Sequence, residues 1–264
     1  MPTADTAPEP PPRPGHVYTH GHHESVLRSH RWRTADNSAA YLLPHLRPGV
    51  SILDVGCGPG TITVDLARRV APGRVVGVDV AAGVVERARA TAREQGVDNV
   101  EFVVGDLDDL EPDRLGGSFD VVHAHQVLQH LIDPVGAMRT MAGLAAGGGL
   151  VAARDSDYPA MSWAPPSAGL DRWLDLYVEV TRSNDAHADA GRHLPRWARE
   201  AGLGDVRYTT STWTFATPED RTWWGDLWAE RVVSSALAGQ AMAYGLAARA
   251  DLDEVAEAWR AWST

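Results

Sequence analysis

Residues 52–61 read ILDVGCGPGT, an apolar run that leads into three closely spaced glycines. The first four residues belong to a short apolar pattern that is typical of a strand. Gly56, Gly58 and Gly60 allow a tight turn and let a ligand approach the backbone closely. A helical pattern follows, so the unpaired N–H groups of its first turn would face that ligand. The stretch predicts a strand, a nucleotide-binding turn and a helix.

Four further apolar runs follow the same plan. Strands are predicted within residues 50–56, 74–80, 100–106, 119–125 and 148–155. Helical spacing of apolar residues occupies 62–70, 83–95 and 134–145, with Gly73, Gly96 and Gly147 near the ends as stop signals. Strands that alternate with helices indicate an α/β fold with a doubly wound, mostly parallel sheet. We expect this Rossmann-like domain to occupy residues 49–264.

The second half of the chain has a different character. Nine of the ten tryptophans lie between Trp163 and Trp262, mostly in helix-like segments. We predict helical, Trp-rich cap elements over 158–200 and 216–264, placed above a flat or hydrophobic ligand. The alternative is that these tryptophans simply fill helix packing. Residues 205–215, DVRYTTSTWTF, alternate as a strand does, and no strand is predicted after them.

The N-terminal segment divides into two parts. Residues 1–15 hold six of the seventeen prolines, which predicts a disordered tail. Residues 16–48 are predicted to form a helical lid, with a helical pattern over 24–46 that breaks near Pro44. Five of the eleven histidines lie within 16–33, but they lack the i, i+4 pairing of helical metal sites. We therefore predict no metal.

Composition restricts the partners. The net charge is −11 and the pI is near 5.4, which disfavours nucleic acid, because that binding depends on Lys and Arg. Cys57 is the only cysteine, so disulfides and Cys-based metal sites are excluded and a reducing cytoplasm fits. Neither a signal pattern nor a membrane-spanning run is evident. We expect a soluble cytoplasmic protein with a small-molecule partner, no membrane partner, and a homodimer as an open alternative.

The segment DVGCGPG, residues 54–60, resembles the first motif of class I S-adenosylmethionine-dependent methyltransferases. A dinucleotide fingerprint spaces its glycines as G-x-G-x-x-G, whereas here they follow an acid as G-x-G-x-G. The resemblance covers residues 50–155 and is nearest to the ubiquinone and menaquinone type of small-molecule methyltransferase. It implies S-adenosylmethionine as cofactor and S-adenosylhomocysteine as product. The chain departs from the family in showing no seventh strand.

The resemblance assigns cofactor-binding roles along the strand ends. The loop that would hold the methionine portion comprises Asp54, Gly56, Cys57, Gly58 and Gly60. Asp79, nineteen residues past Gly60, would accept from the ribose hydroxyls, or would cap the helix that begins near Ala81. Asp106 would accept from the adenine amino group, with Val80 and Leu107 on the two faces of the ring. The alternative for Asp106 is a simple turn aspartate.

Catalytic candidates follow the fourth and fifth strands. His125 is the first choice for a general base, since an imidazole pKa near 6.5 suits the deprotonation of a hydroxyl or phenol. It could instead only hydrogen-bond the cofactor or the core. Arg154 follows the next strand and would reach the same pocket, or would belong to an ordinary polar loop. In the lid, Tyr18, His22 and His23 would contact the cofactor's carboxylate or shield its methyl group, unless the helix is merely docked on the sheet.

The motifs lead to one main hypothesis. It is a methyltransferase that moves a methyl group from S-adenosylmethionine to O, C or N of a small aromatic or hydrophobic metabolite. A sulfonium is already a strong electrophile, so alignment and exclusion of water would do most of the work. The alternatives are an NAD(P)-dependent oxidoreductase and a non-catalytic cofactor-binding module.

Overall fold

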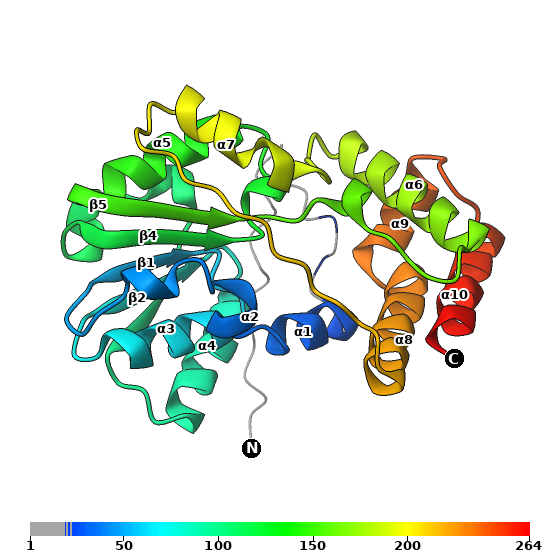
Figure 1. Ribbon diagram of the computed structural model, residues 1–264, viewed down its shortest axis with the longest axis horizontal. Coiled ribbons are helices and arrows are strands. Elements are labelled where there is room, and N and C mark those ends of the chain that lie inside the picture. The colour runs from blue at the N-terminus through cyan, green and yellow to red at the C-terminus, as the bar shows by residue number, and fades with distance from the viewer. Residues whose placement is uncertain (1–18, 20, 22) are drawn as a thin grey trace, which may run out of the picture.

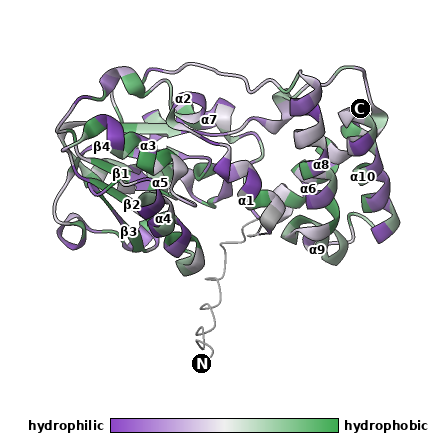
Figure 2. Ribbon diagram, turned by 90° about the horizontal axis from the view of Figure 1, so that it is seen from below, coloured by the Kyte–Doolittle hydropathy of each residue, from purple (hydrophilic) through white to green (hydrophobic). Residues whose placement is uncertain are grey.

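The computed structural model describes residues 19, 21 and 23–264, and Figure 1 shows them as a sheet domain and a helical cap. The predicted tail, Tyr18 and His22 lie outside the described residues. Helix α1 (Glu24–Arg31) lies between the two bodies in Figure 1 and in the perpendicular view of Figure 2. No helix in the described part of the chain has both the length and the apolar character needed to cross a membrane.

The five predicted strands form one parallel sheet, which confirms the α/β fold. They are β1 (Ile52–Val55), β2 (Val75–Asp79), β3 (Val100–Val104), β4 (Phe119–His125) and β5 (Ala145–Arg154). Their spatial order is β3-β2-β1-β4-β5. The chain winds outward from β1 in both directions, so the carboxyl ends of β1 and β4 flank the point where the strand order reverses.

Helices cover both faces of the sheet (Figure 1). One face carries α2 (Ala35–Ser38), α3 (Thr61–Val70) and α4 (Ala82–Glu94), and the other carries α5 (Pro134–Leu144) and α7 (Ala190–Glu200). Strand residues alternate between the two cores: Ile52 packs with α3, whereas Leu53 belongs to the cluster around α5. Because both faces are buried, the strands are nearly continuous apolar runs.

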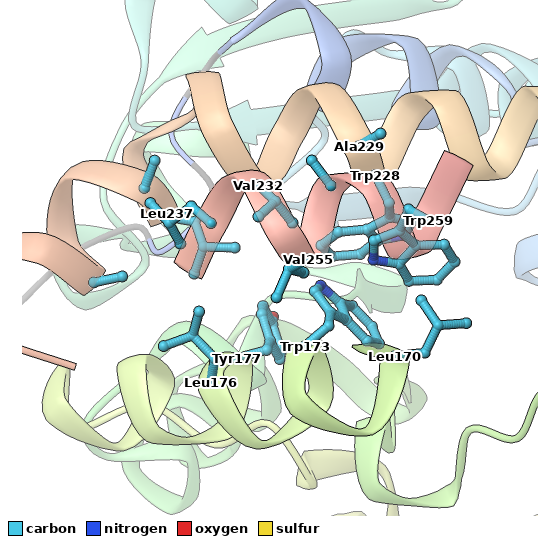
Figure 3. Close-up of a cluster of buried hydrophobic side chains, with 14 of the residues drawn as sticks. Leu170, Trp173, Leu176, Tyr177, Trp228, Ala229, Val232, Leu237, Val255 and Trp259 are labelled. Atoms are coloured by element: carbon cyan, nitrogen blue, oxygen red, sulfur yellow. The ribbon is translucent and has the colours of Figure 1, made fainter. Parts of the chain in front are cut away.

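A second hydrophobic core holds the cap together. It is built from α6 (Ala168–Ser183), α8 (Pro218–Ser234), α9 (Ala236–Ala243) and α10 (Arg249–Ser263). At its centre, shown in Figure 3, Trp173 packs edge-on against Trp228 and Trp259, with ring centroids 4.6 and 4.9 Å away. At these three positions the tryptophans therefore serve helix packing, the alternative to a ligand-binding role.

Two predicted elements are wrong. Residues 205–215 form no strand, and residues 205–216 run as an extended strap from the α7 side of the sheet to α8 (Figure 1). This segment does not join the sheet because Trp213 and Phe215 pack on Trp32, next to α1, instead of on a sheet face. Helix α7, which we expected in the cap, packs on the sheet through Trp197, in the same core as α5.

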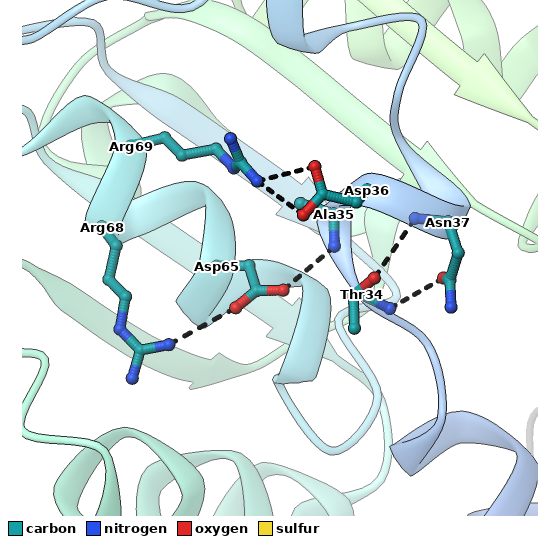
Figure 4. A network of polar contacts seen from close by, with 7 residues as sticks. All are labelled: Thr34, Ala35, Asp36, Asn37, Asp65, Arg68 and Arg69. Carbon is teal, nitrogen blue, oxygen red and sulfur yellow. Dashed lines mark hydrogen bonds and ion pairs between the residues drawn. The ribbon is translucent and has the colours of Figure 1, made fainter.

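The predicted helical pattern over residues 24–46 is divided into three pieces: α1, α2 and a 3₁₀ turn at Leu43–His45. The break before α2 comes from Thr34, which accepts from the backbone N–H of Asn37, while the Asn37 side chain accepts from the N–H of Thr34. Figure 4 shows this capping box beside the ion pair of Asp36 with Arg69, which ties α2 to α3. Reciprocal caps of this kind define a helix start.

Truncation of the cap core should be costly. We expect Trp228→Ala to lower the free energy of unfolding by about 3–5 kcal/mol, because the indole is fully buried and leaves a cavity. Tyr208→Ala is the control, since that strap side chain is 70% exposed and should change stability by less than about 0.5 kcal/mol. Urea unfolding measures both, and equal losses would contradict the assignment of the cap core.

Candidate active site

A cleft of about 2250 Å³ lies between the carboxyl edge of the sheet and the cap, and it continues along β5 beneath the strap. Its floor lies beside the reversal point between β1 and β4, where open α/β sheets bind ligands. The opposite side is aromatic, with Trp163, Trp224 and Trp262 among the lining residues. Ligand pockets usually measure about 300–1,000 Å³, so this cleft has room for two small molecules together.

A buried polar network lies beneath the glycine loop. Asp54 is 3% exposed. Its two carboxylate oxygens accept hydrogen bonds from His123 Nδ1 at 2.7 Å and from Thr63 Oγ1 at 2.6 Å. A carboxylate only accepts, so Nδ1 of His123 carries the hydrogen. The network joins β1, β4 and α3. Asp54 therefore positions the loop from below, and because it also lines the cleft, its cofactor contact stays a prediction.

The three glycines of the loop serve different purposes. Gly56, Gly58 and Gly60 all have positive φ, at 66°, 55° and 80°, which explains the residue type. A Cβ on Gly58 would have only His30 Nδ1 within 4 Å, at 3.9 Å, so this position is open to the cleft. A Cβ on Gly60 would lie 2.9 Å from Cβ of Ala88, and Gly60 does not line the cleft. Gly60 is therefore required for packing of α3 on α4.

Cys57 lines the cleft, but its side chain is buried on the other side of the loop. Its side chain is 7% exposed and belongs to the apolar cluster formed by α3, α4 and Phe102. Burial, followed by the charges of Asp79 and Asp54, raises the pKa of the thiol well above its ordinary value. The thiol is thus a neutral core group, and only the backbone of Cys57 is suited to a ligand.

Asp79 ends β2 and connects the loop to the next helix. Its Oδ2 accepts from the Gly58 N–H at 3.1 Å, and its Oδ1 accepts from the Ala81 N–H at 3.0 Å. A carboxylate offers about four acceptor sites, and Asp79 lines the cleft. The turn role and the predicted ribose role are therefore compatible in one side chain.

The predicted adenine site lies at the same edge. Val80 is 65% exposed and Leu107 is 7% exposed, and both line the cleft together with Asp106. Asp106 also accepts from the Asp108 N–H at 3.2 Å and caps a 3₁₀ turn at Leu107–Asp109, which is the turn role named as its alternative. A large exposed valine beside an apolar neighbour provides a flat surface for a ring.

His125 and Arg154 come together at the ends of β4 and β5, where they are paired in the strand register. Trp213 of the strap covers both side chains. The centroid of the Trp213 ring lies 5.9 Å from the centroid of the His125 ring and 4.5 Å from the Arg154 guanidinium. The His125 imidazole is 6% exposed, and within the described residues neither ring nitrogen has a hydrogen-bond partner. The two catalytic candidates therefore share one aromatic-walled compartment.

The sequence did not predict a role for Arg33, or the link that Gln126 forms to it. Gln126 follows β4 with φ of +56°, an uncommon value for a residue other than glycine. Its backbone N–H donates to the Arg154 carbonyl at 2.7 Å, and its side chain links Arg33 to Ser156. No spacing rule marks these residues, although their places after a strand and after α1 put them near the edge where ligands bind.

The lid is fastened to the cap. His23 caps α1 by accepting from the Ser25 N–H at 3.2 Å, and it lies 3.9 Å from Glu230 of α8. Buried Arg231 donates to the Ser25 carbonyl and to Ser29 Oγ, both at 2.9 Å. His23 is not among the cleft-lining residues, so its predicted cofactor contact gains no support. His30, from the last turn of α1, lines the cleft over Gly58 instead.

Burial sets the protonation states in this compartment. It lowers the pKa of His125 well below the ordinary value, and the charges of Arg33 and Arg154 act in the same direction. It also lowers the pKa of His130 to about 3 and raises the pKa of Asp155 to about 8. At neutral pH both imidazoles are uncharged and most Asp155 carboxyls are protonated. The arginines thus provide the charge of the compartment.

Comparison with known proteins agrees with this geometry. A family model described as a methyltransferase domain matches residues 46–202. The chain belongs to the methyltransferase-domain family. It is an S-adenosylmethionine-dependent methyltransferase of class I, which sets aside the oxidoreductase alternative.

Two relatives and one solved structure illustrate the family. An uncharacterized methyltransferase of Schizosaccharomyces pombe is 32% identical, over 93% of this chain and 89% of its own length. A ubiquinone biosynthesis O-methyltransferase of Xanthomonas axonopodis is 32% identical, over 62% of this chain and 66% of its own. A candidate sarcosine dimethylglycine methyltransferase from Galdieria sulphuraria has the same fold, with a TM-score of 0.51, 17% identity, and coverage of 90% of this chain and 80% of its own.

Removal of the Asp79 carboxylate should weaken cofactor binding. We expect Asp79→Ala to lower the affinity for S-adenosylhomocysteine about tenfold or more, because ribose hydroxyls and two backbone N–H groups lose a charged acceptor. Asp113→Ala, at an exposed acid outside the cleft, is the matched control. Titration calorimetry measures both, and unchanged affinity in Asp79→Ala would reject the ribose assignment.

The raised pKa of Asp155 predicts a specific pH dependence of stability. Its folded pKa of about 8 lies above the unfolded value of about 3.9. Between these values the folded state holds a proton that the unfolded state has released, so this contribution to stability declines as pH rises toward 8. Asp155→Asn should remove that decline. Unfolding free energies measured from about pH 5 to about pH 8 test this, and identical slopes in the two proteins would contradict it.

Proposed function

We propose that this methyltransferase moves a methyl group to O, C or N of a small aromatic or hydrophobic metabolite, which binds between the sheet edge and the cap. The observation that carries the proposal is the continuity of one cleft from the glycine loop to a Trp-lined wall. Aromatic side chains favour flat apolar ligands, because they offer large rigid contact areas. Cytoplasmic location and dimer formation remain predictions.

The residues around the cleft suit S-adenosylmethionine. The open backbone at Gly58 would receive its amino acid portion, and Asp79 its ribose hydroxyls. Val80 and Leu107 would hold the adenine, with Asp106 as acceptor for its amino group. The bound cofactor supplies a methyl group on a positively charged sulfur. This division of roles leaves the compartment of His125, Arg154 and Trp213 for the acceptor.

His125 would orient the nucleophilic atom of the acceptor. Its low pKa keeps the imidazole neutral, so a ring nitrogen can accept a hydrogen bond from a hydroxyl or amine. The same low pKa makes His125 a weak base, which suits an acceptor that releases its proton only as the new bond forms. Trp213 would shield the reacting atoms from water.

The acceptor class is tested by the destination of the methyl group. The protein is incubated with methyl-tritiated S-adenosylmethionine and a cell extract that has been separated by ultrafiltration into small molecules and macromolecules. We expect label in the small-molecule fraction only. Label in protein or nucleic acid would overturn the proposal, and a sample without enzyme provides the background.

Replacement of His125 should affect turnover more than cofactor binding. The assay uses the acceptor found in that fractionation. We expect His125→Ala to lower kcat about 100-fold, which is the lower end of the range for a side chain that accepts a proton or a hydrogen bond during the reaction. The affinity for S-adenosylhomocysteine should change less than about threefold, or 0.7 kcal/mol. His193→Ala, at a histidine outside the cleft, should leave both unchanged. An undiminished kcat in His125→Ala would contradict the assignment.

A further inference from the structure

Two arginines converge on one indole at the reacting end of the cleft. The Arg154 guanidinium lies 4.5 Å from the centroid of the Trp213 ring, and that of Arg33 lies 5.7 Å from it. Arg154 Nε donates to Ser211 Oγ at 3.2 Å, while Trp213 Nε1 donates to the Asn37 carbonyl at 2.7 Å. These two hydrogen bonds fix the positions of the Trp213 indole and the Arg154 guanidinium. All of these residues line the cleft.

The positive charge of Arg154 is not neutralised by a neighbouring acid. Within residues 19, 21 and 23–264, no carboxylate forms an ion pair with Arg154. Asp155 is close enough to affect the pKa of Arg154, but burial raises its own pKa to about 8, so it is mostly protonated near pH 7. This local positive region is notable in a chain with a net charge of −11.

The cofactor does not remove the excess of positive charge. S-adenosylmethionine carries a sulfonium and an ammonium group but only one carboxylate. In the proposed binding mode that carboxylate lies with the amino acid portion of the cofactor at Gly58, so it does not neutralise Arg154, and the bound cofactor brings one further net positive charge to the cleft. A buried or half-buried charge needs a partner of opposite sign. The counter-charge for Arg154 is therefore expected from the acceptor.

We propose that the methyl acceptor carries a carboxylate, which Arg154 binds, beside an aromatic ring that packs on Trp213. This inference rests on the proposed small-molecule function and narrows its substrate class. Arg154 is then a specificity residue, since its fork geometry matches a carboxylate in two hydrogen bonds. His125, paired with Arg154 across the strands, is the neighbouring group for the nucleophilic atom at the other end of the ring.

The test compares aromatic acids with their neutral amides. Protein saturated with S-adenosylhomocysteine is titrated calorimetrically with benzoate, 4-hydroxybenzoate and 2-naphthoate, and with the matching primary amides. We expect at least one acid to bind about tenfold or more tightly than its amide, because a charge-assisted pair is lost in the amide. Arg154→Met should abolish that preference and Arg154→Lys should keep part of it. Arg114→Met, which removes an exposed charge outside the cleft, is the matched control.

Three results would overturn the inference. The first is a panel in which no acid binds more tightly than its amide. The second is a preference that persists in Arg154→Met. The third is a loss of S-adenosylhomocysteine affinity in Arg154→Met as large as that in Asp79→Ala, because the arginine would then serve the cofactor. In all three cases intact S-adenosylhomocysteine binding by the wild-type protein would leave the proposed methyltransferase function standing. Melting temperatures verify that each variant is folded.

Discussion

The hydrogen-bonded chain of His123, Asp54 and Thr63 is the constraint on which the site depends. Three side chains from β4, β1 and α3 satisfy one another in a place that water does not reach. An unpaired carboxylate would be costly there, so the three elements are held in one relative position. The glycine loop begins two residues after Asp54. Its backbone is therefore presented to the cleft in a fixed geometry before any ligand binds.

From that fixed loop, the cleft is completed by segments that are distant in the sequence. Helix α1 is attached to the cap through Arg231, and its last turn is attached to the sheet domain by the hydrogen bond from Thr61 Oγ1 to the His30 carbonyl, at 3.2 Å. The strap covers His125 and Arg154 through Trp213. One side of the compartment thus rests on rigid strand ends, and the other on polar contacts between lid, strap and cap. This division fits a binding site that must admit two molecules and then exclude water.

The sheet could be predicted from the sequence because each buried parallel strand is a nearly continuous apolar run. Such a run can be recognised without knowing which strands pair with it. The acids after the strands were found for the same reason: the carboxyl ends of parallel strands share one edge. The pattern of residues 205–215 was misleading, because side chains alternate in any extended segment, whether it joins a sheet or packs on Trp32. The motif also did not reveal that Cys57 and Gly60 serve packing on the far side of the loop. Arg33 and Trp213 meet only through tertiary structure, so no local signal could identify their contact.

A crystal structure of the complex with S-adenosylhomocysteine tests the central claim most directly, namely that one cleft holds the cofactor at the strand ends and the acceptor under Trp213. We expect the ribose hydroxyls about 3 Å from the Asp79 carboxylate oxygens, the adenine between Val80 and Leu107, and the sulfur directed toward the compartment of His125 and Arg154. A complex in which the ribose lies away from Asp79, or in which the sulfur faces away from that compartment, would contradict the account.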